Sequence, residues 1–190
     1  TGCMGATQGE VLINGYDILK EPEKAKRYIG YLPEHPPLYM DMTVREYLDF
    51  AAELKGIRKS QRREAVDEAE KMVKVQDVEH RLIRNLSKGY RQRVGLAQAI
   101  DKITGSLKVG LRADMIILDE PSVGLDPKQI IEMRDLIRKL AENHTVILSS
   151  HILTEIREVC DYILIISKGK LVAQDTLENL EKMIGFHDVI

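Results

Sequence analysis

Two adjacent carboxylates, Asp119 and Glu120, are the residues of this sequence whose types and position best suit chemistry. The four apolar residues before them, 115–118, predict a buried parallel strand that ends where the two carboxylates emerge. Ligands of open α/β sheets bind at that carboxyl edge. In such a pair, one carboxylate can hold a hydrated Mg²⁺ while the other accepts a proton from a water aimed at a phosphate. We therefore predict that Asp119 is a metal ligand and Glu120 a general base. The alternative is a strand end with solvated charges.

Two more candidates follow the acid pair in the chain. Asp126 stands directly before Pro127, a combination typical of a helix start, and apolar residues then recur at helical spacing through Leu140. An apolar strand over 145–149 leads next to His151, at the same predicted edge. A lone His at a helix start is usually structural, but a place beside two carboxylates favours a catalytic role for His151.

A phosphate-binding helix start is predicted at Ser87. This residue begins a helical pattern over 87–100, and Gly89 follows two residues later. The free N–H groups and the dipole of such a helix start suit an anion. Taken alone, the pattern favours Ser87 acting only as a helix cap.

The remaining periodicities predict the elements that must position these residues. An Asn14-Gly15 pair is typical of a tight hairpin turn, and Thr43 with Glu46 has the spacing of a capping box at a helix start. The other predicted elements, in chain order, are a hairpin over 10–18, a strand over 28–33, helices over 43–56 and 60–73, the helix over 87–100, a short helix over 152–159, an antiparallel strand pair over 162–166 and 171–173, and a last helix over 176–183.

Composition limits the class of protein. The chain has 190 residues, of which 44% are hydrophobic and 31% charged, as in ordinary soluble globular proteins. The net charge of −2 argues against a general nucleic-acid binder. The two cysteines are too few for a disulfide framework, and no apolar run is long enough to span a bilayer, so we expect a cytosolic protein. Residues 55–93 hold twelve Lys or Arg against six Asp or Glu, which indicates either a solvated face or a docking surface for a partner or lipid head groups.

The stretch over 101–113 has little periodicity and is predicted to be a surface connection. Gly105 and Gly110 have the spacing of the first part of a phosphate-binding P-loop. Leu111 and Arg112 follow, however, where a P-loop requires Lys and then Ser or Thr. We therefore exclude a P-loop in this stretch.

The order and spacing of these motifs resemble those of the ATP-binding subunit of an ABC (ATP-binding cassette) transporter, and most of all the export-type cassettes related to gliding-motility and multidrug ATPases. The likeness extends over nearly all of the chain. Residues 86–90 are similar to the family signature Leu-Ser-Gly-Gly-Gln, with Lys88 and Tyr90 as variants. Asp119 and Glu120 resemble the Walker B metal ligand and catalytic base, residues 122–126 resemble the D-loop, and His151 resembles the switch His. Residues 31–34 are similar to the Q-loop, with Glu34 where the family usually has Gln.

The resemblance implies a P-loop NTPase-like α/β fold, with a parallel sheet flanked by helices, a small antiparallel β portion and an inserted α-helical subdomain. That subdomain is expected over about 40–86, leading into the signature helix over 87–100. The resemblance also implies that residues 1–190 form a single ABC ATPase domain that lacks the family's N-terminal Walker A P-loop. Since that loop is the main phosphate cradle, we expect this segment alone to bind ATP poorly.

ATP and Mg²⁺ are the implied cofactors, and a second ABC cassette is an implied partner, because two cassettes of this family close around two ATP molecules. A transmembrane permease is the other implied partner, which places the protein in the cytoplasm on the inner face of the cell membrane; no nucleic acid is expected. The implied residue roles are nucleotide contacts for Ser87, Lys88, Gly89, Tyr90, Glu34 and Asp126, Mg²⁺ ligation for Asp119 and Glu34, and catalysis for Glu120 and His151.

Two other functions remain open at this point. The first is a cytosolic ABC ATPase that acts outside transport. The roughly fifty residues between the Q-loop and the signature suffice for a compact helical subdomain but not for the long coiled coil of chromosome-organising relatives. The second is a non-catalytic fragment that supplies only the signature half of a shared site.

Overall fold

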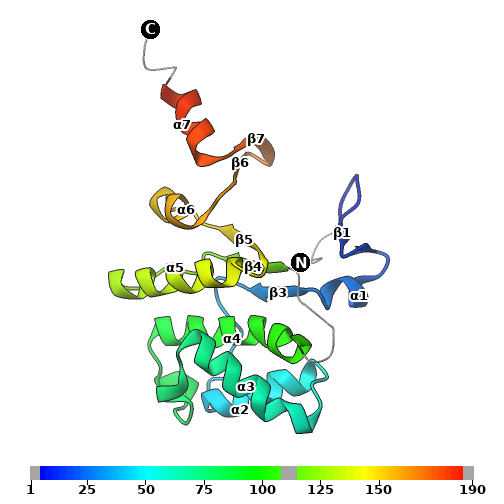
Figure 1. Ribbon diagram of the computed structural model, residues 1–190, viewed down its shortest axis with the longest axis vertical. Helices are drawn as coiled ribbons and strands as arrows, with labels where there is room; N and C mark the ends of the chain where they lie inside the picture. The colour runs from blue at the N-terminus through cyan, green and yellow to red at the C-terminus, as the bar shows by residue number, and fades with distance from the viewer. Residues whose placement is uncertain (1–4, 108–114, 186–190) are drawn as a thin grey trace. The chain divides into compact units, whose positions relative to one another are not determined.

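The computed structural model describes residues 5–107 and 115–185, and the chain divides into two compact units, residues 1–149 and 150–190 (Figure 1). The first unit holds a parallel sheet flanked by helices and a helical subdomain, and each unit holds a small antiparallel pair of strands. The predicted fold class is therefore confirmed. A single ATPase domain over residues 1–190 stays a prediction.

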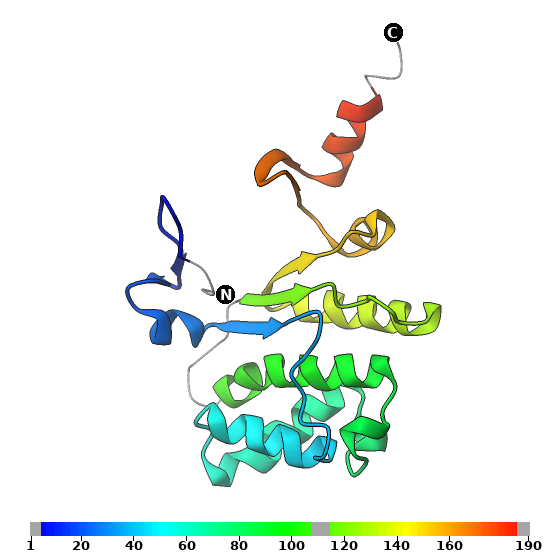
Figure 2. The same cartoon turned by 180° about the vertical axis from the view of Figure 1, so that it is seen from behind.

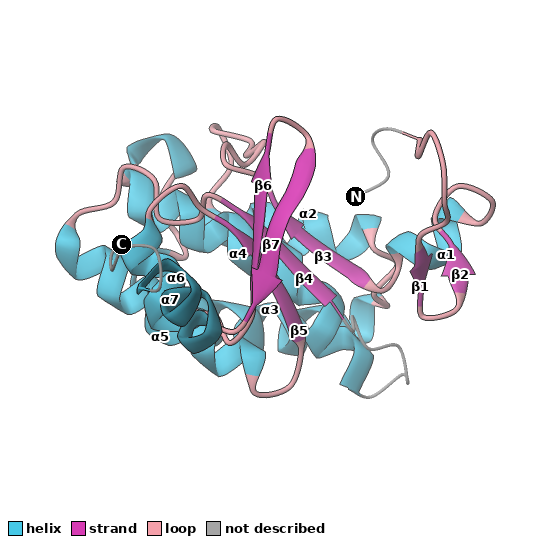
Figure 3. Ribbon diagram, turned by 90° about the horizontal axis from the view of Figure 1, so that it is seen from above, coloured by secondary structure: helices cyan, strands magenta, loops and turns pink. Residues whose placement is uncertain are grey.

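Three parallel strands carry the first unit. They lie in the order β3 (Ile29–Leu32), β4 (Met115–Asp119) and β5 (Thr145–Ser149), side by side as Figure 3 shows. The central strand buries Ile116 and Leu118 completely, and because side chains alternate along a strand these two residues share one face, while the residue between them is half-buried. Because the strands are parallel and in register, all three end at the same edge of the sheet.

The predicted Asn-Gly hairpin is confirmed as β1 (Leu12–Ile13) and β2 (Tyr16–Asp17). Asn14 and Gly15 both have positive φ, 48° and 81°, which is the backbone that a tight two-residue hairpin needs. The hairpin is followed by α1 (Pro22–Lys26). A small apolar cluster joins these elements to the start of β3, and its buried members are Ile13, Ile18, Ala25 and Ile29.

The helical subdomain consists of α2 (Val44–Leu54), α3 (Lys59–Val73), two short 3₁₀ helices, η1 (Gln76–Val78) and η2 (Ile83–Asn85), and the first part of α4 (Lys88–Leu107). Figures 1 and 2 show α4 beside the sheet, with α2 and α3 on its far side. The capping box at Thr43 is present in full, since its hydroxyl accepts from the Glu46 N–H and the Glu46 carboxylate accepts from the Thr43 N–H at 2.8 Å.

Two expectations for this region are wrong. The apolar repeat of the predicted helix over 43–56 includes Leu54, but this side chain, at the last residue of α2, is 71% exposed. The stretch 101–107 was expected in a surface connection but continues α4, since a glycine inside a helix costs only about 1 kcal/mol and does not end it. The rest of that connection, 108–113, lies outside the described residues.

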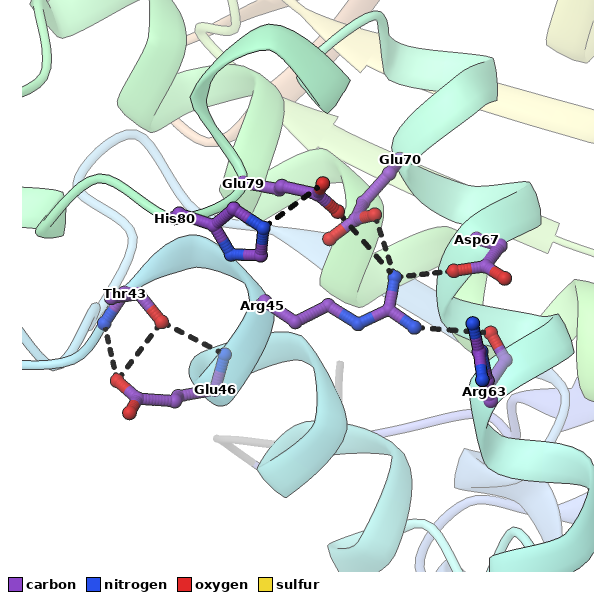
Figure 4. A network of polar contacts seen from close by, with 8 residues as sticks. All are labelled: Thr43, Arg45, Glu46, Arg63, Asp67, Glu70, Glu79 and His80. Atoms are coloured by element: carbon purple, nitrogen blue, oxygen red, sulfur yellow. Dashed lines mark hydrogen bonds and ion pairs between the residues drawn. The ribbon is translucent and has the colours of Figure 1, made fainter.

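Arg45 on α2 ties the helices of the subdomain together (Figure 4). Its guanidinium pairs with Asp67 and, at 2.9 Å, with Glu70, both on α3, and lies 3.8 Å from Glu79, which follows η1. Glu70 is only 1% exposed, and burial raises the pKa of its carboxyl although Arg45 acts to lower it. The apolar pattern of α3 predicts the buried residues Ala65, Val66, Ala69 and Val73, but it gives no signal for this buried acid.

The last helix of the first unit is α5 (Pro127–Ala141). It begins as predicted, because the Asp126 carboxylate accepts from the Gln129 N–H at 2.9 Å and Pro127 occupies the first turn. The buried residues Met133, Ile137 and Leu140 follow the predicted apolar stripe. The helix therefore begins directly after the loop that follows the acid pair.

The second unit comprises α6 (Leu153–Val159), the antiparallel strands β6 (Ile163–Ser167) and β7 (Lys170–Asp175), and α7 (Leu177–Gly185). Lys168 and Gly169 form a tight turn between the two predicted strands, with φ of 49° and 73°. The hairpin exposes several apolar side chains, including those of Leu164, Ile166 and Val172. Among the helices of the described ranges, none combines the length and the apolar character needed to cross a bilayer.

Candidate functional site

The acid pair lies at the carboxyl end of the central strand, as the sequence predicts. Asp119 is the last residue of β4, and the register places it beside Ser149, the last residue of β5. The Ser149 hydroxyl donates to Asp119 Oδ1 at 2.5 Å, and the Glu120 N–H donates to the Ser149 carbonyl at 3.1 Å. The neighbouring strand thus holds the carboxylate of Asp119 and the backbone of Glu120.

Ser149 is a site residue that the sequence reasoning missed. The sequence assigns it only to the end of an apolar strand, yet its hydroxyl orients the carboxylate of Asp119. The signal that identifies it is its position, because the last residues of adjacent parallel strands lie next to each other.

Glu120 has an unusual backbone conformation. Its φ is +46°, in the left-handed region where a side chain other than glycine costs roughly 1–2 kcal/mol. A turn follows at once, in which the Val123 N–H donates to the Glu120 carbonyl at 3.2 Å. Backbone strain of this kind concentrates at functional sites, so the conformation of Glu120 supports the predicted importance of this position.

Glu34 stands two residues beyond the end of β3, and its backbone is attached to α4. The buried side chain of Gln92 donates its Nε2 to the Glu34 carbonyl at 3.0 Å. One turn along the helix, Gly95 leaves room for Pro36, because a Cβ at Gly95 would lie 2.8 Å from that ring. The carboxylate of Glu34 is 44% exposed, and its Oε1 lies 3.8 Å from Nδ1 of His35. Gln92 is a second positioning residue that the sequence reasoning did not assign.

The helix start at Ser87 is a capped N-terminus. The Ser87 hydroxyl accepts from the Tyr90 N–H at 3.3 Å, so the plain capping role is real. The N–H groups of Lys88 and Gly89 belong to the first helical turn, which has no preceding carbonyls to bond. The Tyr90 hydroxyl donates to Asp77 at 2.7 Å, and this hydrogen bond raises the pKa of the phenol.

The start of α4 lies against the start of α5. A Cβ at Gly89 would lie 2.5 Å from Oε1 of Gln129 on α5, and a Cβ at Gly124 would lie 2.5 Å from Nζ of Lys88. Gly124 has φ of +72°, which also favours glycine at this point in the loop before Asp126. The structure therefore brings the segment 87–90 together with the segment 124–129.

His151 and the acid pair belong to different units of the chain. His151 is exposed and belongs to the second unit, two residues after β5 ends. The predicted proximity of His151 to Glu120 accordingly stays a prediction.

The side chains described at this edge of the sheet offer oxygen atoms as metal ligands. The carboxylate of Asp119 and the hydroxyl of Ser149 lie together, and Glu34 follows the strand next to β4. Mg²⁺ is usually bound through one or two carboxylates together with waters and substrate phosphates, so this donor set suits it. Chemically, the edge can hold such a cation and, through Glu120, accept a proton.

The family assignment comes from comparison with known proteins. A family model described as ABC transporter matches residues 1–123, which is more than half of the chain. The chain belongs to the ABC transporter family.

Individual members of the ABC family agree with this assignment. An ABC transporter ATP-binding protein of Bacillus subtilis, YhcH, is 41% identical over 174 residues, which cover 90% of this chain and 53% of that protein. The bacitracin transport ATP-binding protein BcrA of Bacillus licheniformis is 37% identical over 183 residues, covering 95% of this chain and 56% of that protein. This chain thus spans about half the length of these relatives.

A solved structure of an ATP-binding subunit of an ABC transporter has the same fold. It superimposes with a TM-score of 0.76 at 28% identity, covering 94% of this chain and 71% of that subunit. The parallel sheet and the helical subdomain described above are therefore those of the family.

Proposed function

We propose that this protein is the ATP-hydrolysing subunit that powers an ABC-type membrane exporter. The observation that carries the proposal is the acid pair Asp119–Glu120 at the carboxyl end of β4, with Asp119 oriented by Ser149 in a chain of the ABC family. Transport is favoured by the relative BcrA, which is named as a bacitracin transport protein.

The proposed chemistry is the transfer of the γ-phosphoryl group of ATP to water. Glu120 accepts a proton from the attacking water, and His151 contacts the phosphate and that water. Asp119 and Glu34 hold Mg²⁺, which offsets negative charge on the phosphate oxygens when it is bound.

The remaining predicted residues are assigned to binding. Ser87 and Gly89 offer the first-turn donors of α4 to the γ-phosphate held by a second cassette, because a helix N-terminus favours an anion. Lys88, Tyr90 and Asp126 complete the nucleotide contacts of this shared site. Each site therefore needs residues from two chains.

The partners proposed for the protein follow from this arrangement. They are a second ABC cassette, identical or related, and a transmembrane permease that the cassette pair drives. The protein would then lie in the cytoplasm, peripheral on the inner face of the cell membrane. The net charge of −2 gives no support for a nucleic-acid partner.

The test is Glu120→Gln in the full-length protein, with the rate of phosphate release measured at saturating ATP and Mg²⁺. Loss of the base should lower kcat by about 10²- to 10⁴-fold, which is the usual contribution of general-base catalysis. Glu142→Gln is the matched control, because it is the same change on an exposed acid at the end of α5, remote in sequence from the strand edge.

Hydrolysis that is unchanged in the Glu120→Gln variant would remove the proposed base and, with it, the proposed mechanism. Co-purification with a multi-span membrane protein would support the transport role. Co-purification with ribosomes instead would favour a cytosolic ABC ATPase.

A further inference from the structure

The first two turns of α4 contact α5 both at the predicted signature residue Gly89 and beyond the signature, at Arg93. On α4, Gly89 and Arg93 are four residues apart and so lie on the same face of the helix. On α5, Gln129 and Glu132 are three residues apart and also share a face. Gly89 approaches Gln129 closely, and Arg93 forms an ion pair with Glu132. The two helices therefore meet along one pair of matching faces.

Arg93 has the surroundings of a fixed side chain rather than a solvated one. Its side chain is only 12% exposed, and that of Glu132 is 34% exposed. The guanidinium also donates to the Val73 carbonyl at the end of α3, at 3.4 Å, and lies 6.0 Å from the ring centre of Tyr90. Arg93 thus contacts the end of α3, the signature variant Tyr90 and α5 at once.

The position of this ion pair links two motifs that the proposed function uses. Ser87 caps α4 six residues before Arg93, which is about 9 Å along a helix. Asp126 caps α5 six residues before Glu132, at the same distance. Because a helix is rigid over such a length, fixing Arg93 to Glu132 fixes the spacing between the two helix starts.

We propose that Arg93 is a positioning residue for the nucleotide site: its ion pair with Glu132 holds the signature segment 87–90 against the loop 122–126 of the same chain, so that both segments meet the nucleotide together. This inference rests on the proposed function, because it assigns to the pair an effect on ATP use. Arg93 itself need not touch the nucleotide. Tyr90 adds to the hold, since its hydroxyl bonds Asp77 and its ring lies under the guanidinium.

The experiment is a double-mutant cycle in the full-length protein with Arg93→Met, Glu132→Met and the double variant. We expect each single variant to raise the KM for ATP about tenfold with a smaller change in kcat, since couplings of this kind amount to roughly 5- to 150-fold. The double variant should be no worse than either single variant, because both remove the same interaction. The charge exchange Arg93→Glu with Glu132→Arg should bring KM back toward the wild-type value.

Arg84→Met is the matched control, because Arg84 pairs with Asp41 in the same subdomain but both side chains are well exposed. It should leave KM within about twofold of wild type. Thermal unfolding is recorded for every variant, and Glu132→Gln, a smaller change on the more exposed partner, replaces any variant that does not fold.

A KM that stays within twofold in both Arg93→Met and Glu132→Met would overturn the inference, as would single effects that multiply in the double variant. Glu120→Gln is measured on the same preparation. If it abolishes hydrolysis while the Arg93 variants behave as wild type, the inference fails and the proposed function stands. If hydrolysis is unchanged in Glu120→Gln, the proposed function itself fails.

Discussion

Two groups of carboxylates in the first unit differ in what faces them. In the helical subdomain, Glu70, Asp67 and Glu79 gather around the guanidinium of Arg45. At the sheet edge, the carboxylate of Asp119 accepts a hydrogen bond from the neutral hydroxyl of Ser149. The first group faces a cation, whereas the Asp119 carboxylate faces a neutral hydroxyl.

This difference distinguishes a carboxylate that stabilises the fold from one that is available to bind a cation. A buried carboxylate is stable only when the fold supplies a partner, and Arg45 supplies one charge for three acids across two helices and a loop. A hydroxyl fixes the direction of a carboxylate and leaves its negative charge available to a cation that arrives with a ligand. The sequence has acids in the helical subdomain and at the sheet edge, and the group that faces each acid, a guanidinium or a hydroxyl, distinguishes them.

The largest expected effect is on the Arg45 side of this comparison. Arg45→Met should lower the free energy of unfolding by about 3 kcal/mol, because it leaves the buried Glu70 without its charge partner. Urea unfolding followed by circular dichroism measures this loss. Arg84→Met, which breaks an exposed pair with Asp41, should cost less than about 1 kcal/mol. Equal costs for the two variants would contradict a special role for Arg45.

A smaller effect is expected at the sheet edge. Ser149→Ala removes one hydrogen bond to Asp119 and should cost about 1 kcal/mol of stability. Ser149→Thr keeps the hydroxyl and suits a strand, so it should remain close to wild type in the same unfolding measurement. The comparison would be weakened if Ala and Thr behaved alike, because the hydroxyl would then not be what orients the acid.

The smallest expected effect is a pH dependence of the unfolding free energy that arises from Glu70. Because burial raises the pKa of its carboxyl, the folded protein binds more protons there than the unfolded chain at pH values above the usual glutamate range. Stability from this group is therefore regained as pH falls through the raised pKa and lost as pH rises through it. The unfolding free energy of wild type minus that of Glu70→Gln should grow on acidification.

The unfolding free energies of wild type and Glu70→Gln are compared because other acids change the stability with pH in the opposite direction. The backbone N–H of Thr43 lowers the pKa of Glu46, so the stability from Glu46 is lost as pH falls. This contribution is common to wild type and Glu70→Gln and cancels between them. A difference that shrinks on acidification would show that Arg45, and not burial, governs Glu70.

Features with strong local signals were predictable from the sequence. The Asn14-Gly15 turn, the capping box at Thr43, the apolar strand before Asp119 and the cap at Asp126 each depend on residues within a few positions of one another. The predicted place of the acid pair followed from the strand that carries it. Family resemblance then supplied the roles that these local patterns could not.

What the sequence did not reveal depends on contacts between distant segments. Ser149 orients a residue 30 positions away, and Gln92 holds a carbonyl 58 positions away. The burial of Glu70 is invisible to an apolar pattern, because it depends on Arg45 from another helix. The helix α4 continues through Leu107, although the sequence over 101–113 has little apolar periodicity.

The left-handed backbone of Glu120 has a consequence for the evolution and engineering of this protein. Glycine, or to a lesser degree asparagine, adopts such a backbone at lower cost than glutamate, by roughly 1 kcal/mol. Position 120 is thus a place where selection for a sturdier fold and selection for catalysis favour different amino acids. Choosing replacements at this position by stability alone would discard the side chain that the proposed chemistry uses as its base.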